Sequence, residues 1–262
     1  MKSKPFLLLA QNRNSTLLIT IGRNLAIEVK NKNALLGIVI PCYNEAENIP
    51  KLIERCKLAI SRADCEFLLV DNGSTDSTAM VFDSISPVQG IKFMKLEKNQ
   101  GYGGGILAGL NTLQNEFIGW THADLQTDPV DIIEIKLISG SANQFLKGTR
   151  RKRRFLDQVF TSGMSFAMSF LFLTRLSDIN AQPSVVSRDL FEKWSRPPSD
   201  FSLDLYAFVA ARRESADIRR FPVDFSTRYA GDSKWNNGFM DRIKMTQRTI
   251  AYARKLRRDL SK

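Results

Sequence analysis

Leu36-Gly37-Ile38-Val39-Ile40, followed directly by Pro41-Cys42-Tyr43-Asn44-Glu45, is the segment from which the architecture can be worked out. An uninterrupted apolar run of this kind predicts a strand that is buried on both of its faces. A helix is predicted next, because apolar residues recur at helical spacing from Ile49 to Ile60. Pro50 falls in the first turn of this helix, where proline is tolerated. A buried strand followed by an amphipathic helix is typical of an α/β sheet.

Strands and helices continue to alternate along the rest of the chain. After the first strand, the pattern predicts strands at 67–70, 91–96 and 117–121, with a helix at 104–113. This alternation indicates an α/β fold with a mostly parallel central sheet and helices on both faces. The second half is mixed, with helices predicted at 156–173, 203–214 and 239–260 and extended segments at 185–187 and 218–225.

The pattern also divides the chain into parts. Residues 1–33 do not share the alternation, and weakly alternating segments around Gly22-Arg23-Asn24 predict a small appended hairpin. The main domain is expected at 34–236, with a donor half at about 34–148 and an acceptor half at 149–236. Residues 237–262 are expected to form a basic amphipathic C-terminal helix.

The charge balance indicates an anionic partner. The 262 residues carry a net charge of +11, so nucleotide phosphates, nucleic acid and acidic membrane surfaces are the classes to distinguish. Six of the eight residues from Lys147 to Arg154 are basic. This loop is either plain solvated surface or a contact for acceptor phosphate or anionic lipid. Nucleic acid is disfavoured, because no aromatic residues are interleaved with the basic ones.

The cysteines and the apolar runs bear on location. Cys42, Cys56 and Cys65 are odd in number and lack metal-ligand spacing, which indicates reduced thiols in a cytosolic protein. The apolar run at 6–10 is shorter than the roughly 7 residues of a signal peptide. No run reaches the about 18 residues of a membrane span. We expect a cytoplasmic protein, with peripheral binding to the cytoplasmic face of a membrane as an alternative that the basic C-terminal helix supports.

Polar segments follow each of the first four strands. In open α/β sheets, ligands bind beyond the carboxyl ends of the strands. The four segments are Pro41 to Glu45, Asp71 to Asp76, Asn99 to Gly105 and His122 to Pro129. Four such loops at one edge of a sheet predict a binding site.

Two of these loops allow both a binding and a structural interpretation. Asp71 can accept hydrogen bonds from a nucleobase or a ribose, whereas Asp76 is better explained as a helix cap. The glycines from Gly101 to Gly105 open a helix, where backbone amides attract phosphate. The alternative for these glycines is a tight turn.

The segment His122-Ala123-Asp124-Leu125-Gln126 predicts a metal site. On an extended segment, Asp124 and Gln126 point the same way and can hold Mg²⁺ or Mn²⁺ through oxygen ligands. Such an ion neutralises the charge that builds up on a leaving diphosphate. His122, the one histidine of the sequence, either ligates a softer ion such as Mn²⁺ or hydrogen-bonds within the site.

Taken together, these loops resemble glycosyltransferase family 2, especially its branch of dolichyl-phosphate mannose synthases and bacterial polyprenyl-phosphate sugar transferases. The likeness covers about residues 35–236 and extends to Gly148-Thr149-Arg150 and to Arg228, Gly231, Ser233 and Lys234. It implies a nucleotide-diphospho-sugar transferase fold of the GT-A type. It also implies inverting transfer of a hexose-type sugar in cell-envelope polysaccharide synthesis.

The resemblance implies roles for individual residues. The nucleoside is expected among Pro41, Tyr43, Glu45 and Asp71. Asp124 and Gln126 are expected to bind the metal, although the family's first acidic ligand is replaced by His122. The remaining donor contacts are expected from Gly101, Gly103, Arg150, Arg228 and Lys234.

The sequence leaves two alternatives for the acceptor of the sugar. A lipid-linked phosphate is already ionised, whereas a saccharide hydroxyl needs a general base. Asp204 aligns with an acidic residue that the family places near the reaction centre and is the predicted base, while Asp200 is expected to cap a helix. Where the resembled branch carries an arginine four residues before a serine, this sequence has Asp157 or Gln158 before Thr161 or Ser162. A non-catalytic nucleotide-sugar-binding protein is a third interpretation, which His122 supports.

Overall fold

The computed structural model describes residues 16–20, 26–30, 34–137, 139–140, 143–151, 165–225 and 239–260. By contacts, the chain divides into two compact units, Met1–Ala34 and Leu35–Lys262. In the first unit, β1 (Thr16–Thr20) and β2 (Ala26–Lys30) pair antiparallel, with Thr16 opposite Lys30.

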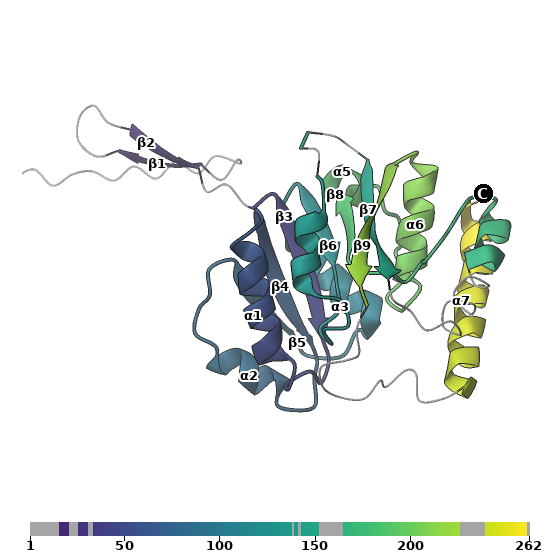
Figure 1. The fold of residues 1–262 in the computed structure, drawn as a ribbon, viewed down its shortest axis with the longest axis horizontal. Helices are drawn as coiled ribbons and strands as arrows, with labels where there is room; N and C mark the ends of the chain where they lie inside the picture. The colour runs from purple at the N-terminus through teal and green to yellow at the C-terminus, as the bar shows by residue number, and fades with distance from the viewer. Residues whose placement is uncertain are drawn as a thin grey trace, which may run out of the picture. The chain divides into compact units, whose positions relative to one another are not determined.

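The second unit is built on a seven-stranded sheet with the order β5-β4-β3-β6-β8-β7-β9 (Figure 1). Its first four members run parallel: β3 (Leu36–Cys42), β4 (Cys65–Asn72), β5 (Ile91–Leu96) and β6 (Phe117–Trp120). β8 (Ser184–Ser187) is antiparallel to both of its neighbours, and β7 (Gln144–Arg151) runs parallel to β9 (Asp217–Asp224). The expected mostly parallel sheet is confirmed.

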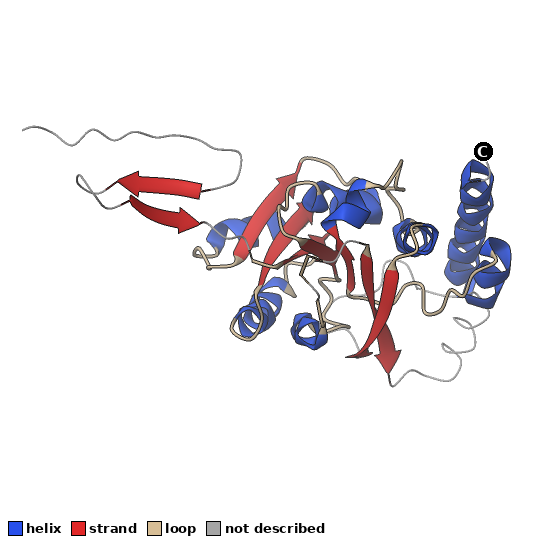
Figure 2. Cartoon of the chain, turned by 90° about the horizontal axis from the view of Figure 1, so that it is seen from above, coloured by secondary structure: helices blue, strands red, loops and turns tan. Residues whose placement is uncertain are grey.

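Helices cover both faces of this sheet (Figure 2). Besides a helical stretch at 165–172, the second unit contains α1 (Ile49–Ile60), α2 (Thr78–Ser84), α3 (Gly101–Leu110), η1 (Pro129–Glu134), α5 (Arg188–Glu192), α6 (Leu203–Arg213) and α7 (Phe239–Leu260). Among the helices that the structure describes, none is both long and apolar enough to cross a membrane.

The alternation of side chains along β3 explains its apolar run. Ile38 and Ile40 belong to the core that includes α1, whereas Val39 belongs to the core that includes α3 and α6. All three side chains are fully buried. A strand with a helix layer on each side has no face for polar residues, which is why five consecutive apolar residues predicted it correctly.

Several elements differ from the expectation. α3 begins at Gly101, three residues before the predicted start, because the amides of Gly101 and Gly104 find acceptors in Asn99 Oδ1 and the Ser199 carbonyl. Neither β7 nor the short helix α5 was predicted, and α2 was expected only as a helix that Asp76 would cap, without bounds. Of the helix predicted at 156–173, residues 156–164 lie outside the described part of the chain.

A buried ion pair accounts for the polar sequence of β7. Lys147 is 0% exposed, and its Nζ donates hydrogen bonds to Asp204 Oδ1 at 3.2 Å and to Ser184 Oγ at 2.8 Å. The other carboxylate oxygen, Asp204 Oδ2, accepts from the hydroxyl of Tyr102 at 3.0 Å. One carboxylate therefore connects β7, β8, α3 and α6. Burial lowers the pKa of Lys147 to about 8, although the charge of Asp204 opposes this shift.

We expect Lys147→Met to destabilise the fold by about 3–5 kcal/mol, because it leaves the Asp204 carboxylate buried without its cation. The double variant Lys147→Met/Asp204→Leu should recover at least half of this loss. Urea unfolding provides the free energies. Lys193→Met is the control, since Lys193 pairs with Glu214 at the surface and such pairs contribute about 0–1 kcal/mol. Equal losses for the two single lysine variants would contradict the prediction.

The same lysine predicts a pH dependence of stability. Its pKa falls from 10.5 to about 8 on folding, so between these values the unfolded chain holds a proton that the folded chain has released. Stability therefore rises with pH through this window, and the contribution is lost as the pH falls through 8. From about pH 7.5 to 9.5, the wild type should gain at least about 1 kcal/mol relative to Lys147→Met/Asp204→Leu. A difference that stays constant with pH would show that Lys147 is not desolvated.

Candidate active site

The candidate site lies where the strand order of the sheet reverses. From β3 the chain adds β4 and β5 on one side and then places β6 on the other. A crevice forms at such a switch point, beyond the carboxyl ends of the strands. The loops that follow β3 and β6 flank it, and those after β4 and β5 lie beside them. The structure therefore gathers the four predicted loops at one edge of the sheet.

The loop after β3 is held by the loop after β4. Asn44 has a positive φ of 57°; its amide donates to Ser74 Oγ at 3.0 Å, and its Oδ1 accepts the amide of Thr75 at 2.8 Å. The amide of Glu45 donates to Thr78 Oγ1 at 3.0 Å. These bonds fix the position of the backbone on both sides of Asn44.

The four residues predicted around a nucleoside lie on these adjoining strand ends. Pro41 is opposite Val70 in the sheet register, and Cys42 is opposite Asp71. Tyr43 and Glu45 follow on the first loop, and both are partly exposed. The structure thus brings Pro41, Tyr43, Glu45 and Asp71 to one region.

Asp71 and Asp76 have different surroundings. Asp71 is 3% exposed and its Oδ1 accepts the amide of Ser74 at 2.9 Å. Asp76 accepts the amide of Thr78 at 2.9 Å at the start of α2, where Ser77 and not Asp76 occupies the N-cap position. Burial raises the pKa of the nearby Cys42 thiol, and the charges of Glu45 and Asp71 raise it further. The Cys42 thiol therefore stays protonated next to the negative charges of Glu45 and Asp71.

The two predicted glycines contact protein backbone. Gly101 has a φ of +80°, and a Cβ built on it would lie 2.6 Å from the carbonyl oxygen of Ser199. A Cβ on Gly103 would lie 2.5 Å from the carbonyl oxygen of Pro198. Asn72 fixes the other side, donating to the Gly101 carbonyl at 2.9 Å. Close packing against the 198–200 segment therefore accounts for the absence of side chains at 101 and 103.

The metal segment is not extended, and this expectation was wrong. β6 ends at Trp120, and residues 123–127 form a bend in which Leu125 has a φ of +57°. The physical reason is the carboxylate of Asp124, whose Oδ1 accepts the amide of Gln126 at 3.1 Å and closes a turn. Asp124 and Gln126 are brought together by this turn and not by strand alternation.

The donor set suits a hard or borderline divalent ion that also binds its substrate. Asp124 is 4% exposed, whereas Gln126 and His122 are partly exposed. In the described part of the chain, no three His, Cys, Asp or Glu residues are grouped closely enough to hold a metal by themselves. A carboxylate, an amide oxygen and an imidazole leave coordination positions that phosphate oxygens and water can fill.

His122 belongs to a group of aromatic rings. Its ring lies 5.7 Å from that of Tyr102, which in turn stacks on Phe201 at 4.6 Å and an angle of 12°. Tyr102 connects the metal segment to the buried carboxylate of Asp204. Gln182 donates a hydrogen bond to the Tyr102 hydroxyl. The sequence analysis did not single out Tyr102 or Gln182, and it counted Lys147 in a basic loop, whereas the structure buries Lys147 in β7. An aromatic ring inside a glycine run was the available signal for Tyr102.

The remaining predicted residues differ in their surroundings. Arg150 pairs with Asp178: its Nε donates to Oδ1 at 3.0 Å, and its amide donates to Oδ2 at 3.0 Å. Asp200 accepts the amide of Ser202 at 2.8 Å just before α6, but the N-cap position expected for Asp200 is occupied by Ser202. Arg228 and Lys234 lie outside the described residues, as do Asp157, Gln158, Thr161 and Ser162.

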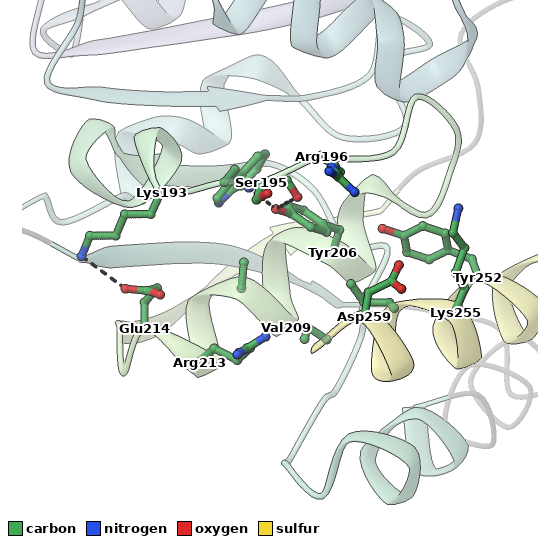
Figure 3. Close-up of a pocket in the computed structure, with 13 residues that line it drawn as sticks. Lys193, Ser195, Arg196, Tyr206, Val209, Arg213, Glu214, Tyr252, Lys255 and Asp259 are labelled. Atoms are coloured by element: carbon green, nitrogen blue, oxygen red, sulfur yellow. Dashed lines mark hydrogen bonds and ion pairs between the residues drawn. The ribbon is translucent and has the colours of Figure 1, made fainter. Parts of the chain in front are cut away.

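A cavity of about 600 Å³ lies apart from these loops, along the α6–α7 side (Figure 3). Tyr206 lines it and bonds through its hydroxyl to the backbone of Ser195. Lys193 and Glu214 form an ion pair at its edge. None of the predicted donor or metal residues lines this cavity.

Comparison with known proteins identifies the domain. Residues 37–135 match the family model described as Glycosyl transferase family 2. The undecaprenyl-phosphate 4-deoxy-4-formamido-L-arabinose transferase of Salmonella choleraesuis (strain SC-B67) is 31% identical over 213 residues, which are 77% of this chain and 62% of that protein. The enzyme of the same name from Proteus mirabilis (strain HI4320) is 30% identical over 123 residues, 45% of this chain and 37% of that protein. The chain thus spans less than two thirds of the length of these curated relatives.

Solved structures agree on the fold. Glucosyl-3-phosphoglycerate synthase from Mycobacterium tuberculosis, in complex with Mn²⁺, uridine diphosphate and glucosyl-3-phosphoglycerate, superposes with a TM-score of 0.65 at 16% identity, covering 86% of this chain and 80% of that one. The same enzyme with uridine diphosphate also gives 0.65, at 17% identity and coverages of 84% and 79%. These neighbours have the GT-A type of fold that the sequence predicted. The chain therefore contains a glycosyl transferase family 2 domain, built around the β3–β6 switch point.

Proposed function

We propose that this protein is an inverting glycosyltransferase that moves a sugar from a nucleotide-diphosphate donor to a lipid-linked phosphate. The observation that carries the choice of acceptor is the confinement of Asp204. This carboxylate is 3% exposed, and its oxygens accept hydrogen bonds from Lys147 and Tyr102. A phosphate oxygen is already ionised and attacks the sugar without a general base, so the proposed acceptor needs no free carboxylate here.

The donor is proposed to bind across the four loops. Pro41, Tyr43 and Glu45 form one side of the nucleoside site, and Asp71 accepts hydrogen bonds from the base or the ribose. The bonds that fix Asn44 to Ser74 and Thr75 hold this surface in place before the donor arrives. Arg228 and Lys234 are proposed to close over the diphosphate. Arg150 is proposed to contribute its positive charge to the donor site while it stays paired with Asp178.

Asp124 and Gln126, with His122 beside them, are proposed to hold Mg²⁺ or Mn²⁺. When bound, such an ion offsets the negative charge that collects on the departing diphosphate. The chain's own part is orientation: the Asp124–Gln126 turn fixes the ligands, and the ring of Tyr102 lies against His122. The Mycobacterium neighbours, crystallised with Mn²⁺ and uridine diphosphate, support this choice of ion and donor.

The names of the relatives support the acceptor. They are transferases named for undecaprenyl phosphate, a lipid-linked phosphate. We accordingly place the reaction at the cytoplasmic face of a membrane, in the synthesis of cell-envelope polysaccharide.

A second candidate function is transfer to a saccharide hydroxyl with Asp204 as the base. The observation in its favour is that the Tyr102 hydroxyl joins Asp204 to the aromatic group beside His122, so a proton could pass along this hydrogen bond. A nucleotide-sugar-binding protein without turnover is the third, supported by the imidazole of His122 in place of the family's first acidic ligand.

Asp124→Asn should lose the Mn²⁺-dependent thermal stabilisation by uridine or guanosine diphosphates and reduce transfer by about 100-fold or more, because the charged ligand is removed. Melting temperatures with and without Mn²⁺, together with donor turnover, are the measurements. Asp83→Asn is the control, since Asp83 pairs with Lys95 on the surface of α2. Full Mn²⁺-dependent stabilisation in Asp124→Asn would refute the metal assignment, and full stabilisation without turnover in the wild type would favour the binding protein.

Asp204→Asn separates the two acceptors. With polyprenyl phosphate as acceptor, we expect turnover to stay within about tenfold of the wild type, since no proton is removed from the nucleophile. Transfer to polyprenyl phosphate and to free saccharides is measured for both proteins over a range of pH, with nucleotide-diphosphate binding as the control for folding. A loss of about 1000-fold with donor binding intact would instead support Asp204 as a base acting on a hydroxyl.

A further inference from the structure

The helix at 165–172 presents an apolar face to solvent. Phe166, Phe170 and Leu173 follow one another at helical spacing, and their side chains are 76%, 73% and 80% exposed. The opposite face is already packed, because Met168 is buried in the core and Ser169 Oγ accepts the amide of Leu176 at 2.8 Å. These three outward residues are therefore not needed to attach the helix to the domain.

The end of this helix also carries backbone strain. Leu173 has a φ of +50°, a conformation that glycine adopts readily and leucine rarely. A leucine at this position leaves a large apolar side chain in water and costs conformational energy. Strain of this kind is an indication of function when the side chain has no packing role.

A groove rich in arginine lies next to the apolar face. Its volume is about 370 Å³, and it is lined by Leu171, Phe172, Leu173, Thr174, Val209, Arg212, Arg213 and Arg257. Of the described residues that line it, none is acidic. α7 passes beside the 165–172 helix in both views (Figures 1 and 2) and contributes Arg257 to this groove.

We infer that this face is a membrane-docking surface, with Phe166, Phe170 and Leu173 entering the lipid and the arginine groove receiving anionic phospholipid headgroups. Exposed aromatic and leucine side chains beside a basic groove match the boundary between acyl chains and negatively charged headgroups. Because the described lining of the groove holds three arginines and no acidic residue, its charge favours an anionic leaflet over a neutral one. The inference rests on the proposed lipid-phosphate acceptor, because it identifies the surface that contacts the membrane holding that acceptor.

The position of this surface suits that function. α6 begins at Leu203, beside the buried Asp204, and ends at Arg213 in the groove. Nine residues of α-helix separate Asp204 from Arg213, a rise of about 14 Å. A membrane docked at the groove would therefore lie about 14 Å, the length of one short helix, from Asp204 at the edge of the candidate site.

The test measures binding of the full chain to vesicles of phosphatidylcholine with and without phosphatidylglycerol. Phe166→Ser/Phe170→Ser should weaken binding to the anionic vesicles by about tenfold or more, and Arg213→Gln/Arg257→Gln should do the same at low salt. The matched controls are Met80→Ser, whose methionine is 73% exposed on α2, and Lys57→Gln/Arg62→Gln at the end of α1. Both controls should bind as the wild type does.

A fluorescent label gives a readout that does not depend on affinity. The native cysteines are buried, so Phe170→Cys can be labelled selectively with a polarity-sensitive dye. Its emission should rise with anionic vesicles, whereas the same dye on Met80→Cys should not respond. Unchanged emission at both positions, or equal losses of binding in control and test variants, would overturn the inference.

The outcome is separable from that of the proposed function. Mn²⁺-dependent stabilisation by nucleotide diphosphates is measured on the same variants in the absence of lipid. If that stabilisation is present while the wild type does not bind anionic vesicles, the docking surface is wrong and the donor site stands. If vesicles bind through Phe166 and Phe170 but no nucleotide diphosphate stabilises the protein, the docking surface stands and the proposed function fails.

Discussion

The buried contact between Lys147 and Asp204 is the constraint on which the second half of the domain depends. A charged pair with no access to water is retained only when hydrogen bonds satisfy both partners, and here Ser184 and Tyr102 complete the set. The pair fixes α6 against β7 and β8, at the point where the sheet changes from parallel to antiparallel pairing. Through Tyr102 it also fixes the aromatic group beside the proposed metal segment, so that one ion pair orients parts of both the proposed acceptor side and the proposed donor side.

This arrangement explains how the site is divided between rigid and adaptable parts. The proposed nucleoside side is made of strand ends and of two loops joined by hydrogen bonds from backbone amides to side chains, such as the bond from the Asn44 amide to Ser74 Oγ. The proposed metal side is one turn, closed by the carboxylate of Asp124 on the amide of Gln126. Neither side depends on a single long side chain for its shape, so both surfaces exist before a ligand binds, which lowers the entropic cost of binding.

Sequence reasoning was most successful where one physical rule acted alone. The apolar run of β3, the helical spacing of α1 and the polar ends of four strands led to the mostly parallel sheet and to the edge at which the four loops gather, and the structure confirms them. It failed where one particular side-chain contact decided the local structure. β7 was missed because Lys147 is stabilised in the core by a residue 57 positions away, and the turn at Leu125 was missed because it depends on one side-chain bond. The roles of Arg228 and Lys234 remain predictions from the resemblance, since both lie outside the described residues.

The contact of Gly101 and Gly103 with the carbonyls of Ser199 and Pro198 has a consequence for how this sequence can vary. Because the two glycines contact backbone atoms of this segment, the side chains at 198 and 199 can change without altering the separation of the two segments. A methyl group at either glycine would push the acceptor-side segment away from α3. Relatives that preserve this contact should therefore conserve the two glycines, while the residues at 198 and 199 vary.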